Sequence, residues 1–209
     1  MEGMIARWYS KNQQKSIEQY RSWAEMASGH IPEGGNVLEI APGPGYLSLE
    51  LAKLGSYKIV GLDISKTFVE IAREKAAAAG VHVDFRQGDA ADMPLPNDAF
   101  DFAICTAAFK SFPEPIMVLD EIFRVLRKGS EAVIIDLSKD ASKAEITEYV
   151  NQMKLSRMNS FMTKFTFKRM LLRWAYTKGQ IQDLASKSRF GACDILGEGI
   201  GFEVWLRKP

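Results

Sequence analysis

The sequence predicts an α/β fold with a doubly wound, mostly parallel seven-stranded sheet, helices on both faces and a C-terminal antiparallel hairpin. Three observations lead to this prediction. An apolar run at 37–40 breaks into a Pro- and Gly-rich loop, and a helical pattern follows. Apolar runs then alternate with helical patterns up to residue 136, which favours parallel strands with right-handed crossovers. The last two strand-like runs, 193–196 and 202–207, flank a Gly-rich turn, as in a hairpin.

The loop after the first predicted strand has the sequence Glu39-Ile40-Ala41-Pro42-Gly43-Pro44-Gly45. Its glycines allow the backbone to approach a ligand closely. The helix predicted from Tyr46 would present its free N–H groups at the same place. A second predicted strand, 57–62, ends at Asp63, where a carboxylate can accept hydrogen bonds from the two hydroxyls of a ribose. These features predict a site for a cofactor that contains a nucleoside.

Two classes of cofactor fit such a loop. Dinucleotide folds use the pattern Gly-x-Gly-x-x-Gly, and here Ser48 occupies the third position, so the match is incomplete. The other class places an acid at the strand end before a Gly-x-Gly-x-Gly loop. Glu39 would be that acid, with Ala41 in place of the first glycine. An alanine fits there if its φ stays negative, although its methyl group would lie close to the cofactor.

The remaining elements follow from spacing and from capping residues. Residues 4–28 are predicted to be helical. Ser65 is a good N-cap for a helix that runs to Ala79, with Gly80 as its stop. The other predicted elements are strands at 81–86, 100–105 and 132–135 and a helix at 113–127.

Length and composition predict a single domain, 1–209, with 46% hydrophobic and 25% charged residues. A helical segment, 1–30, precedes the sheet, and a helical insertion at about 141–177 follows the fifth strand. Cys105 and Cys193 fall in predicted strands, which favours two buried thiols in a reducing compartment. The sequence shows neither a secretory pattern at its start nor a run long enough to span a membrane, so a cytoplasmic protein is predicted.

Strand, loop and acid together resemble motif I of the class I S-adenosylmethionine-dependent methyltransferases. The runs Phe85-Arg86-Gln87-Gly88-Asp89-Ala90, 93–95, 100–102 and 118–129 are also similar to this family. The resemblance is closest to its small-molecule branch, which includes the quinone-biosynthesis C-methyltransferases. It covers about residues 33–137 well and the last thirty loosely. Five parallel strands plus a terminal hairpin is the arrangement of this family, whereas dinucleotide folds lack the hairpin.

The resemblance implies a site for S-adenosylmethionine. The loop at 41–45 would hold its methionine part, braced by Glu39. Asp63 would take the ribose hydroxyls, and the segments after the third and fourth strands would bind the adenine and pass beneath the methyl group. The implied cofactor-binding residues are Glu39, Ala41, Pro42, Gly43, Gly45, Asp63, Ile64, Gly88, Asp89, Ala90, Thr106 and Ala107.

Simpler roles compete with two of these assignments. Asp63, expected at an exposed strand end, would also serve as a cap for the helix at Ser65, and Asp89 would also start a turn. No catalytic residue is predicted, because a general base is needed only if the acceptor must lose a proton. Lys110, Asp136 and Tyr9 lie near the relevant sheet edge, but each is better explained as structural or solvated. No metal site is predicted either, since no cluster of metal ligands stands out.

Residues 151–178 carry seven basic residues and no acidic one, which leaves the rest of the chain at −6, because the whole chain is +1. Three interpretations of this segment stay open. It is an amphipathic helical pair with a solvated basic face, a lid over the active site, or a patch for a membrane surface or nucleic acid. As a lid it would contribute Phe161 and Phe165 to the substrate pocket, with Tyr9 from the N-terminal segment.

The sequence therefore predicts methyl transfer from S-adenosylmethionine to a small, apolar or aromatic acceptor, by in-line displacement without a metal. The alternatives are a nicotinamide-dependent oxidoreductase and a non-catalytic S-adenosylmethionine-binding protein that acts through a partner. A nucleic-acid substrate is disfavoured, because the run 105–109 differs from the Asn/Asp-Pro-Pro-Tyr run of DNA amino-methyltransferases. Peripheral membrane contact stays open as an unsupported alternative, and neither the acceptor nor the oligomeric state is predicted.

Overall fold

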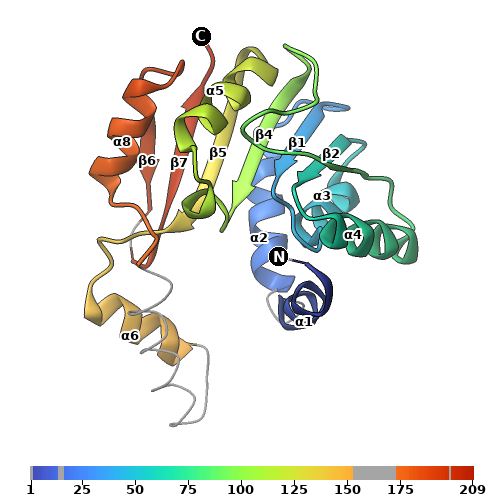
Figure 1. Ribbon diagram of the computed structural model, residues 1–209, viewed down its shortest axis with the longest axis horizontal. Helices are drawn as coiled ribbons and strands as arrows, with labels where there is room; N and C mark the ends of the chain where they lie inside the picture. Colours follow the sequence, from blue (N-terminus) through green and yellow to red (C-terminus); the bar gives the residue numbers. More distant parts are fainter. Residues whose placement is uncertain (1, 14–16, 153–172, 198) are drawn as a thin grey trace.

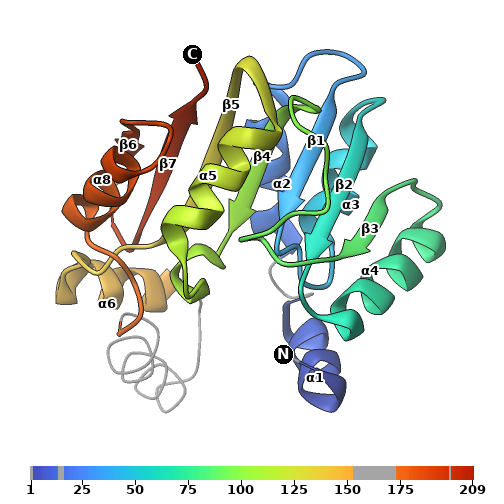
Figure 2. The ribbon, with the colours of Figure 1, turned by 45° about the horizontal axis from the view of Figure 1, so that its top comes forward.

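The computed structural model is built on one seven-stranded sheet with the strand order β3-β2-β1-β4-β5-β7-β6 (Figure 1, Figure 2). The structure describes residues 2–13, 17–152, 173–197 and 199–209. The first five strands pair in parallel, and β7 runs antiparallel to both β5 and β6. The strands are β1 (Asn36–Ile40), β2 (Lys58–Asp63), β3 (Asp84–Gln87), β4 (Phe100–Thr106), β5 (Leu126–Leu137), β6 (Asp194–Leu196) and β7 (Gly201–Arg207). The predicted fold class is confirmed.

The sheet is buried because successive residues of its central strands face two different helical layers. Leu38 of β1 packs in one layer with residues of α5 and α8, whereas Val37 packs in the other with residues of α2 and α3. The helices are α1 (Gly3–Gln13), α2 (Ile17–Ser28), α3 (Tyr46–Leu54), α4 (Lys66–Ala79), η2 (Phe109–Ser111, a 3₁₀ turn), α5 (Pro115–Val125), α6 (Lys143–Gln152) and α8 (Lys178–Lys187). Helices therefore cover both faces, as predicted.

Several boundaries differ from the predicted ones. The helical stretch predicted at 4–28 is two helices, α1 and α2. The fifth strand begins at Leu126, directly after α5, rather than at residue 132. It is longer because its start pairs with β4 across a bulge, in which Leu126 lies opposite Phe100 and Glu131 opposite Phe102. Gly129, with a φ of 80°, makes the turn within this bulge.

The two cysteines have different surroundings. Cys105 is buried in β4, and burial raises the pKa of its thiol. Cys193 precedes β6 and is only partly buried, so the prediction of two buried thiols in strands is wrong for this residue. Within the described part of the chain, no helix combines the length and the apolar character needed to cross a membrane.

The insertion after β5 is described at its two ends. α6 packs through Ile146 and Val150 against Ala175, and Thr177 with Gln180 forms a capping box at the start of α8. Phe161 and Phe165, the predicted lid residues, lie outside the described residues. Their role stays a prediction.

Candidate functional site

A cavity of about 400 Å³ lies at the edge to which the parallel strands point, where open α/β sheets bind ligands. The segments that leave β1, β2, β3 and β4 meet at this cavity. The predicted residues that line it are Tyr9, Ala41, Pro42, Gly43, Asp63, Ile64, Gly88, Asp89, Ala90, Thr106 and Ala107. Glu39 and Gly45, the two remaining predicted cofactor residues, are not among its lining residues.

Glu39 is buried at the end of β1, where its carboxylate accepts hydrogen bonds from the N–H of Ser48 (2.9 Å) and from the Ser48 hydroxyl. Burial raises the pKa of Glu39 to about 7, against the opposing effect of these hydrogen bonds. Ser48, the residue that breaks the dinucleotide pattern, therefore ties the first turn of α3 to the strand before the loop. The contact reaches the helix that follows the loop, and the role of Glu39 in the cofactor site stays a prediction.

The two loop glycines serve different purposes. Gly45 has a φ of 79°, and a Cβ there would lie 2.7 Å from the Phe85 ring and 2.9 Å from the Cβ of Ala72, so this glycine allows close internal packing. Gly43 has a φ of 53°, and no atom lies within 4 Å of the place its Cβ would take. Because Gly43 lines the cavity, its backbone is left open to a ligand.

Ala41 adopts a φ of 54°, so the condition under which an alanine was expected to fit here, a negative φ, is not met. Its N–H donates to the carbonyl of Leu62 (2.8 Å), which fixes the turn out of β1. The left-handed region costs a residue with a Cβ about 1–2 kcal/mol. Ala41 thus takes a backbone conformation that favours glycine.

Asp63 ends β2, and both of its carboxylate oxygens are engaged. One accepts from the N–H of Gly43 (2.9 Å) and the other from the N–H of Ser65 (2.8 Å). The residue is only 6% exposed, so the expected exposed strand end is wrong, and burial raises the pKa of its carboxyl group. Each carboxylate oxygen can accept more than one hydrogen bond. The structural role is therefore compatible with binding a ligand at the cavity.

Asp89 follows β3 and forms the turn that was its simpler predicted role. Its carboxylate accepts from the N–H of Ala91 (2.9 Å), and its carbonyl accepts from the N–H of Asp92 (3.3 Å). It also lines the cavity, with Gly88 and Ala90 on either side. A Cβ on Gly88 would lie 2.7 Å from a methyl carbon of Leu62, so the glycine lets this segment approach β2.

The segment after β4 is held by a buried ion pair. Ala107 has a φ of 56°, its N–H donates to Ile135 (2.7 Å), and its carbonyl accepts from Lys110 Nζ (2.7 Å). Lys110 Nζ also donates to Asp136 Oδ1 (2.6 Å), and the two side chains are 12% and 3% exposed. Lys110 and Asp136 therefore hold the cavity-lining segment in place, which supports the structural role expected for them.

Four aromatic side chains, here called the aromatic wall, also line the cavity, and three of them were not predicted from the sequence. Tyr20 of α2, Phe68 of α4 and Phe112 lie there beside the predicted Tyr9. Tyr9 packs edge-on against Phe68, with ring centres 5.9 Å apart, and burial raises the pKa of Tyr20. In the sequence they resemble ordinary packing residues. Only the packing of α1, α2, α4 and the segment after β4 brings them to one cavity.

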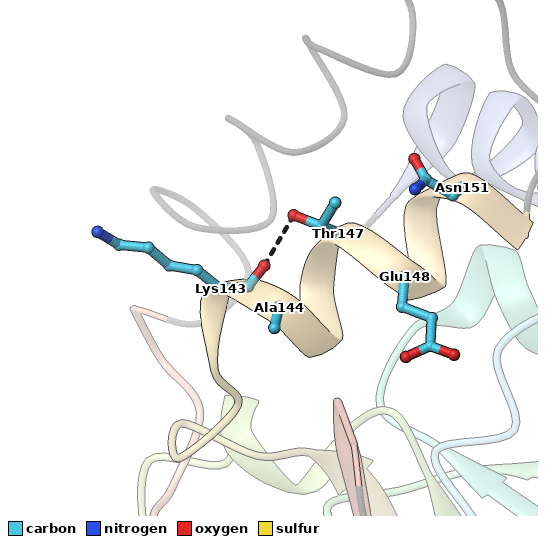
Figure 3. A pocket seen from close by; sticks show the side chains of 5 residues that line it. All are labelled: Lys143, Ala144, Thr147, Glu148 and Asn151. Atoms are coloured by element: carbon cyan, nitrogen blue, oxygen red, sulfur yellow. Dashed lines mark hydrogen bonds between the residues drawn. The ribbon is translucent and has the colours of Figure 1, made fainter.

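A second hollow, of about 790 Å³, lies beside α6 (Figure 3). Of the described residues, α6 alone lines it, with Lys143, Ala144, Thr147, Glu148 and Asn151. Figure 3 shows Lys143 and Glu148 projecting in different directions, and the Thr147 hydroxyl donates to the Lys143 carbonyl (2.7 Å). Among the described residues that line this hollow, polar groups do not converge, so we place the candidate site at the smaller cavity.

Metal ligands do not gather at either place in the described part of the chain, which contains no group of three His, Cys, Asp or Glu side chains placed to hold an ion. His30 stacks near the Trp205 ring, with centres 4.3 Å apart, and its Nδ1 lies 3.3 Å from Glu131 Oε2. His82 is exposed and precedes β3. Both histidines thus lie away from the residues that line the cavity.

Comparison with known proteins gives a match to the methyltransferase domain family over residues 38–134. The chain is 34% identical over 138 residues to a 2-phytyl-1,4-naphtoquinone methyltransferase from Synechococcus elongatus, which covers 63% of this chain and 59% of that protein. It is 33% identical over 123 residues to a demethylmenaquinone methyltransferase from Deinococcus radiodurans, covering 58% and 50%. The chain therefore spans only about half to three-fifths of the length of these curated relatives.

Solved structures with the same fold cover nearly the whole chain. A crystal structure from Methanococcus maripaludis, assigned as an S-adenosyl-L-methionine-dependent methyltransferase, has a TM-score of 0.78 and 21% identity, covering 97% of this chain and 91% of that one. A SAM-dependent methyltransferase from Aquifex aeolicus has a TM-score of 0.64 and 18% identity, covering 92% and 87%. At these identities the likeness shows the fold alone.

Proposed function

We propose that this chain, which matches the methyltransferase domain family over residues 38–134, is a member of it and transfers the methyl group of S-adenosylmethionine to a small apolar or aromatic acceptor. One observation carries the proposal. The loop after β1, Asp63 at the end of β2 and Asp89 after β3 converge on the cavity at the carboxyl edge of the sheet. A glycine loop with two strand-end carboxylates suits a cofactor that has a ribose and a charged amino-acid part.

The residues of the cavity fit this cofactor. Asp63 is already fixed by the N–H groups of Gly43 and Ser65, so its remaining lone pairs are pre-oriented for ribose hydroxyls. The open space at Gly43 lets the backbone lie against the methionine part. Ile64, although 65% exposed, lines the cavity beside Asp63 and would pack on the adenine ring.

The acceptor would bind against the aromatic wall. Tyr9, Tyr20 and Phe112 line the same cavity as the glycine loop. Such a wall suits a flat apolar molecule, which it would hold by area burial and ring packing. The names of the curated relatives describe quinone-type acceptors. We propose this class of acceptor for the chain as well, without choosing a single compound.

The sulfonium of S-adenosylmethionine supplies an activated methyl group, so the protein has mainly to orient the acceptor and exclude water. The segment from Ala107 to Phe112 contributes to the lining of the same cavity as the glycine loop and would set the acceptor's position. The buried pair of Lys110 and Asp136 keeps that segment rigid. We assign neither Lys110 nor Asp136 as a general base, because the two side chains are paired with each other in an ion pair.

Ligand binding tests the proposal directly. S-adenosylhomocysteine should bind in calorimetry and raise the melting temperature, whereas NADH should do neither. A shift with NADH alone would favour the oxidoreductase alternative and overturn the proposal. Binding without incorporation of a labelled methyl group into apolar metabolite extracts or simple quinones would favour the non-catalytic alternative.

A further inference from the structure

The outer face of α1 exposes three large apolar side chains within two helical turns. Met4 is 87% exposed, Ile5 65% and Trp8 68%. The described chain has only five other exposed large hydrophobic residues, and these are dispersed over several elements. A group of this kind on a soluble surface marks an interaction site more often than a scatter of single residues does.

The helical positions of these residues form a defined pattern. Met4 and Trp8 are four residues apart and lie one above the other on the helix surface. Ile5 and Arg7 are displaced by nearly equal angles to either side of that row, so the apolar stripe has a cation along one flank. This is the pattern of a helix that lies in a lipid interface, with apolar side chains below and cationic side chains reaching the headgroups.

The charge of α1 selects the kind of surface. Its sequence contains Arg7 and Lys11 and no acidic residue. The preceding acid, Glu2, accepts hydrogen bonds from the N–H and hydroxyl of Thr67 and so is held against α4. A symmetric contact between two copies would bring these basic helices together, which is unfavourable. An anionic surface complements them.

The position of α1 connects this face to the cavity. Its inner side packs through Ala6 against Phe68 and Ile71 of α4, and Tyr9 reaches the cavity wall with Phe68. α1 lies at the edge to which the parallel strands point (Figure 1, Figure 2). One helix therefore has a wall of the candidate site on one side and the apolar stripe on the other.

We propose that the outer face of α1, formed by Met4, Ile5, Arg7 and Trp8, docks the protein onto an anionic lipid bilayer. The bilayer would receive Met4, Ile5 and Trp8 at the depth of the headgroups, with Arg7 near lipid phosphates. The cavity wall would then lie one helix away from the lipid. The proposal goes beyond the proposed function, and its test uses neither cofactor nor acceptor.

Vesicle flotation of the full chain tests the proposal. Vesicles of phosphatidylcholine mixed with phosphatidylglycerol should bind the protein, and vesicles of phosphatidylcholine alone should bind it much less. The double variant M4Q/W8Q should partition roughly tenfold less, and Arg7→Glu about fivefold or more, because one variant loses apolar contact and the other reverses a charge. Met117→Gln, which changes an exposed methionine of α5, is the matched control and should bind like the wild type.

Each outcome decides the question. Melting temperature and S-adenosylhomocysteine affinity, measured on the same variants, show whether the fold and the cavity survive. S-adenosylhomocysteine affinity tests the proposed function, whereas vesicle binding tests the docking proposal. Absence of vesicle binding, or binding that M4Q/W8Q and Arg7→Glu leave unchanged, would overturn the proposal. A dimer in solution that M4Q/W8Q dissociates would instead assign the face to a second copy of the chain.

Discussion

Ala41 and Ala107 lie at the ends of the neighbouring strands β1 and β4, and both have a positive φ, 54° and 56°. Both line the cavity. The N–H of Ala41 donates to the carbonyl of Leu62, and the N–H of Ala107 donates to the carbonyl of Ile135. Residues kept in this region against their steric preference cluster at functional sites, since the surrounding structure must hold them there. The two alanines thus mark the candidate site independently of its polar residues.

Replacing either alanine by glycine should therefore be neutral or stabilising, by up to about 1.5 kcal/mol. Relief of the left-handed conformation gains about 1–2 kcal/mol, and the added freedom of the unfolded chain offsets about 0.5–1 kcal/mol of this. Chemical denaturation measures the difference. Ala108→Gly is the control, because Ala108 has a φ of −121°, and it should destabilise. Equal losses in all three variants would show that the left-handed conformation carries no cost here.

The buried pair of Lys110 and Asp136 should contribute as a unit. Lys110→Met leaves the Asp136 carboxylate buried without its cation and should destabilise by about 3 kcal/mol or more. Asp136→Asn should cost less. In the wild type the backbone N–H of Lys110 donates to Asp136 Oδ2 (3.0 Å), and the amide oxygen of asparagine can still accept this hydrogen bond.

The double variant K110M/D136N provides the check on that pair. Its loss of stability should be clearly smaller than the two single losses added together, because residues in one contact are coupled. Additive losses in a double-mutant cycle would mean that the two groups act separately. The exposed pair of Lys187 and Asp183 is the matched control, with both side chains 58% exposed, and it should show little coupling.

Asp63→Asn and Asp63→Ala should weaken S-adenosylhomocysteine binding by roughly tenfold or more, because charge-assisted hydrogen bonds to the ribose are lost. Both variants should also lower the melting temperature, since the carboxylate holds the N–H groups of Gly43 and Ser65. Calorimetry on the folded fraction separates the two effects. Unchanged affinity in Asp63→Asn, with only stability reduced, would leave the residue with its structural role alone.

The sequence predicted those features that depend on neighbours along the chain. Gly43, Asp63 and Asp89 are recognisable because a strand end, a loop and an acid stand at fixed short spacings, and the parallel order of the strands brings them together. The sign of φ at Ala41 was not predictable in this way. It depends on the hydrogen bond to Leu62 of the neighbouring strand, which the local sequence does not contain.

The aromatic wall shows a second limit. Tyr20 and Phe112 come from an N-terminal helix and from the segment after β4, and their place at one cavity depends on how those elements pack. Helical periodicity identifies Tyr20 as a packing position but does not indicate what it packs against. For the same reason α1 and α2 were predicted as one stretch, because apolar spacing alone does not locate a break between two short helices.

Glu39 gives a prediction about pH. Its pKa is about 7 in the folded protein, against an ordinary value of 4.5, so between these two pH values the folded state holds the proton more tightly than the unfolded state. The contribution of this group to stability is therefore fully present below about pH 4.5 and is lost as the pH rises through 7. The whole effect is on the order of 3 kcal/mol.

Glu39→Gln should abolish this dependence, because its side chain resembles the protonated acid and its oxygen still accepts from the Ser48 N–H. The variant should match the wild type near pH 5 and be the more stable of the two at pH 8, as measured by urea denaturation across that range. Glu50→Gln is a suitable control, since Glu50 is buried but pairs with Lys53 and Arg21. A difference between wild type and Glu39→Gln that stays constant from pH 5 to pH 8 would mean that Glu39 remains ionised in the folded protein throughout.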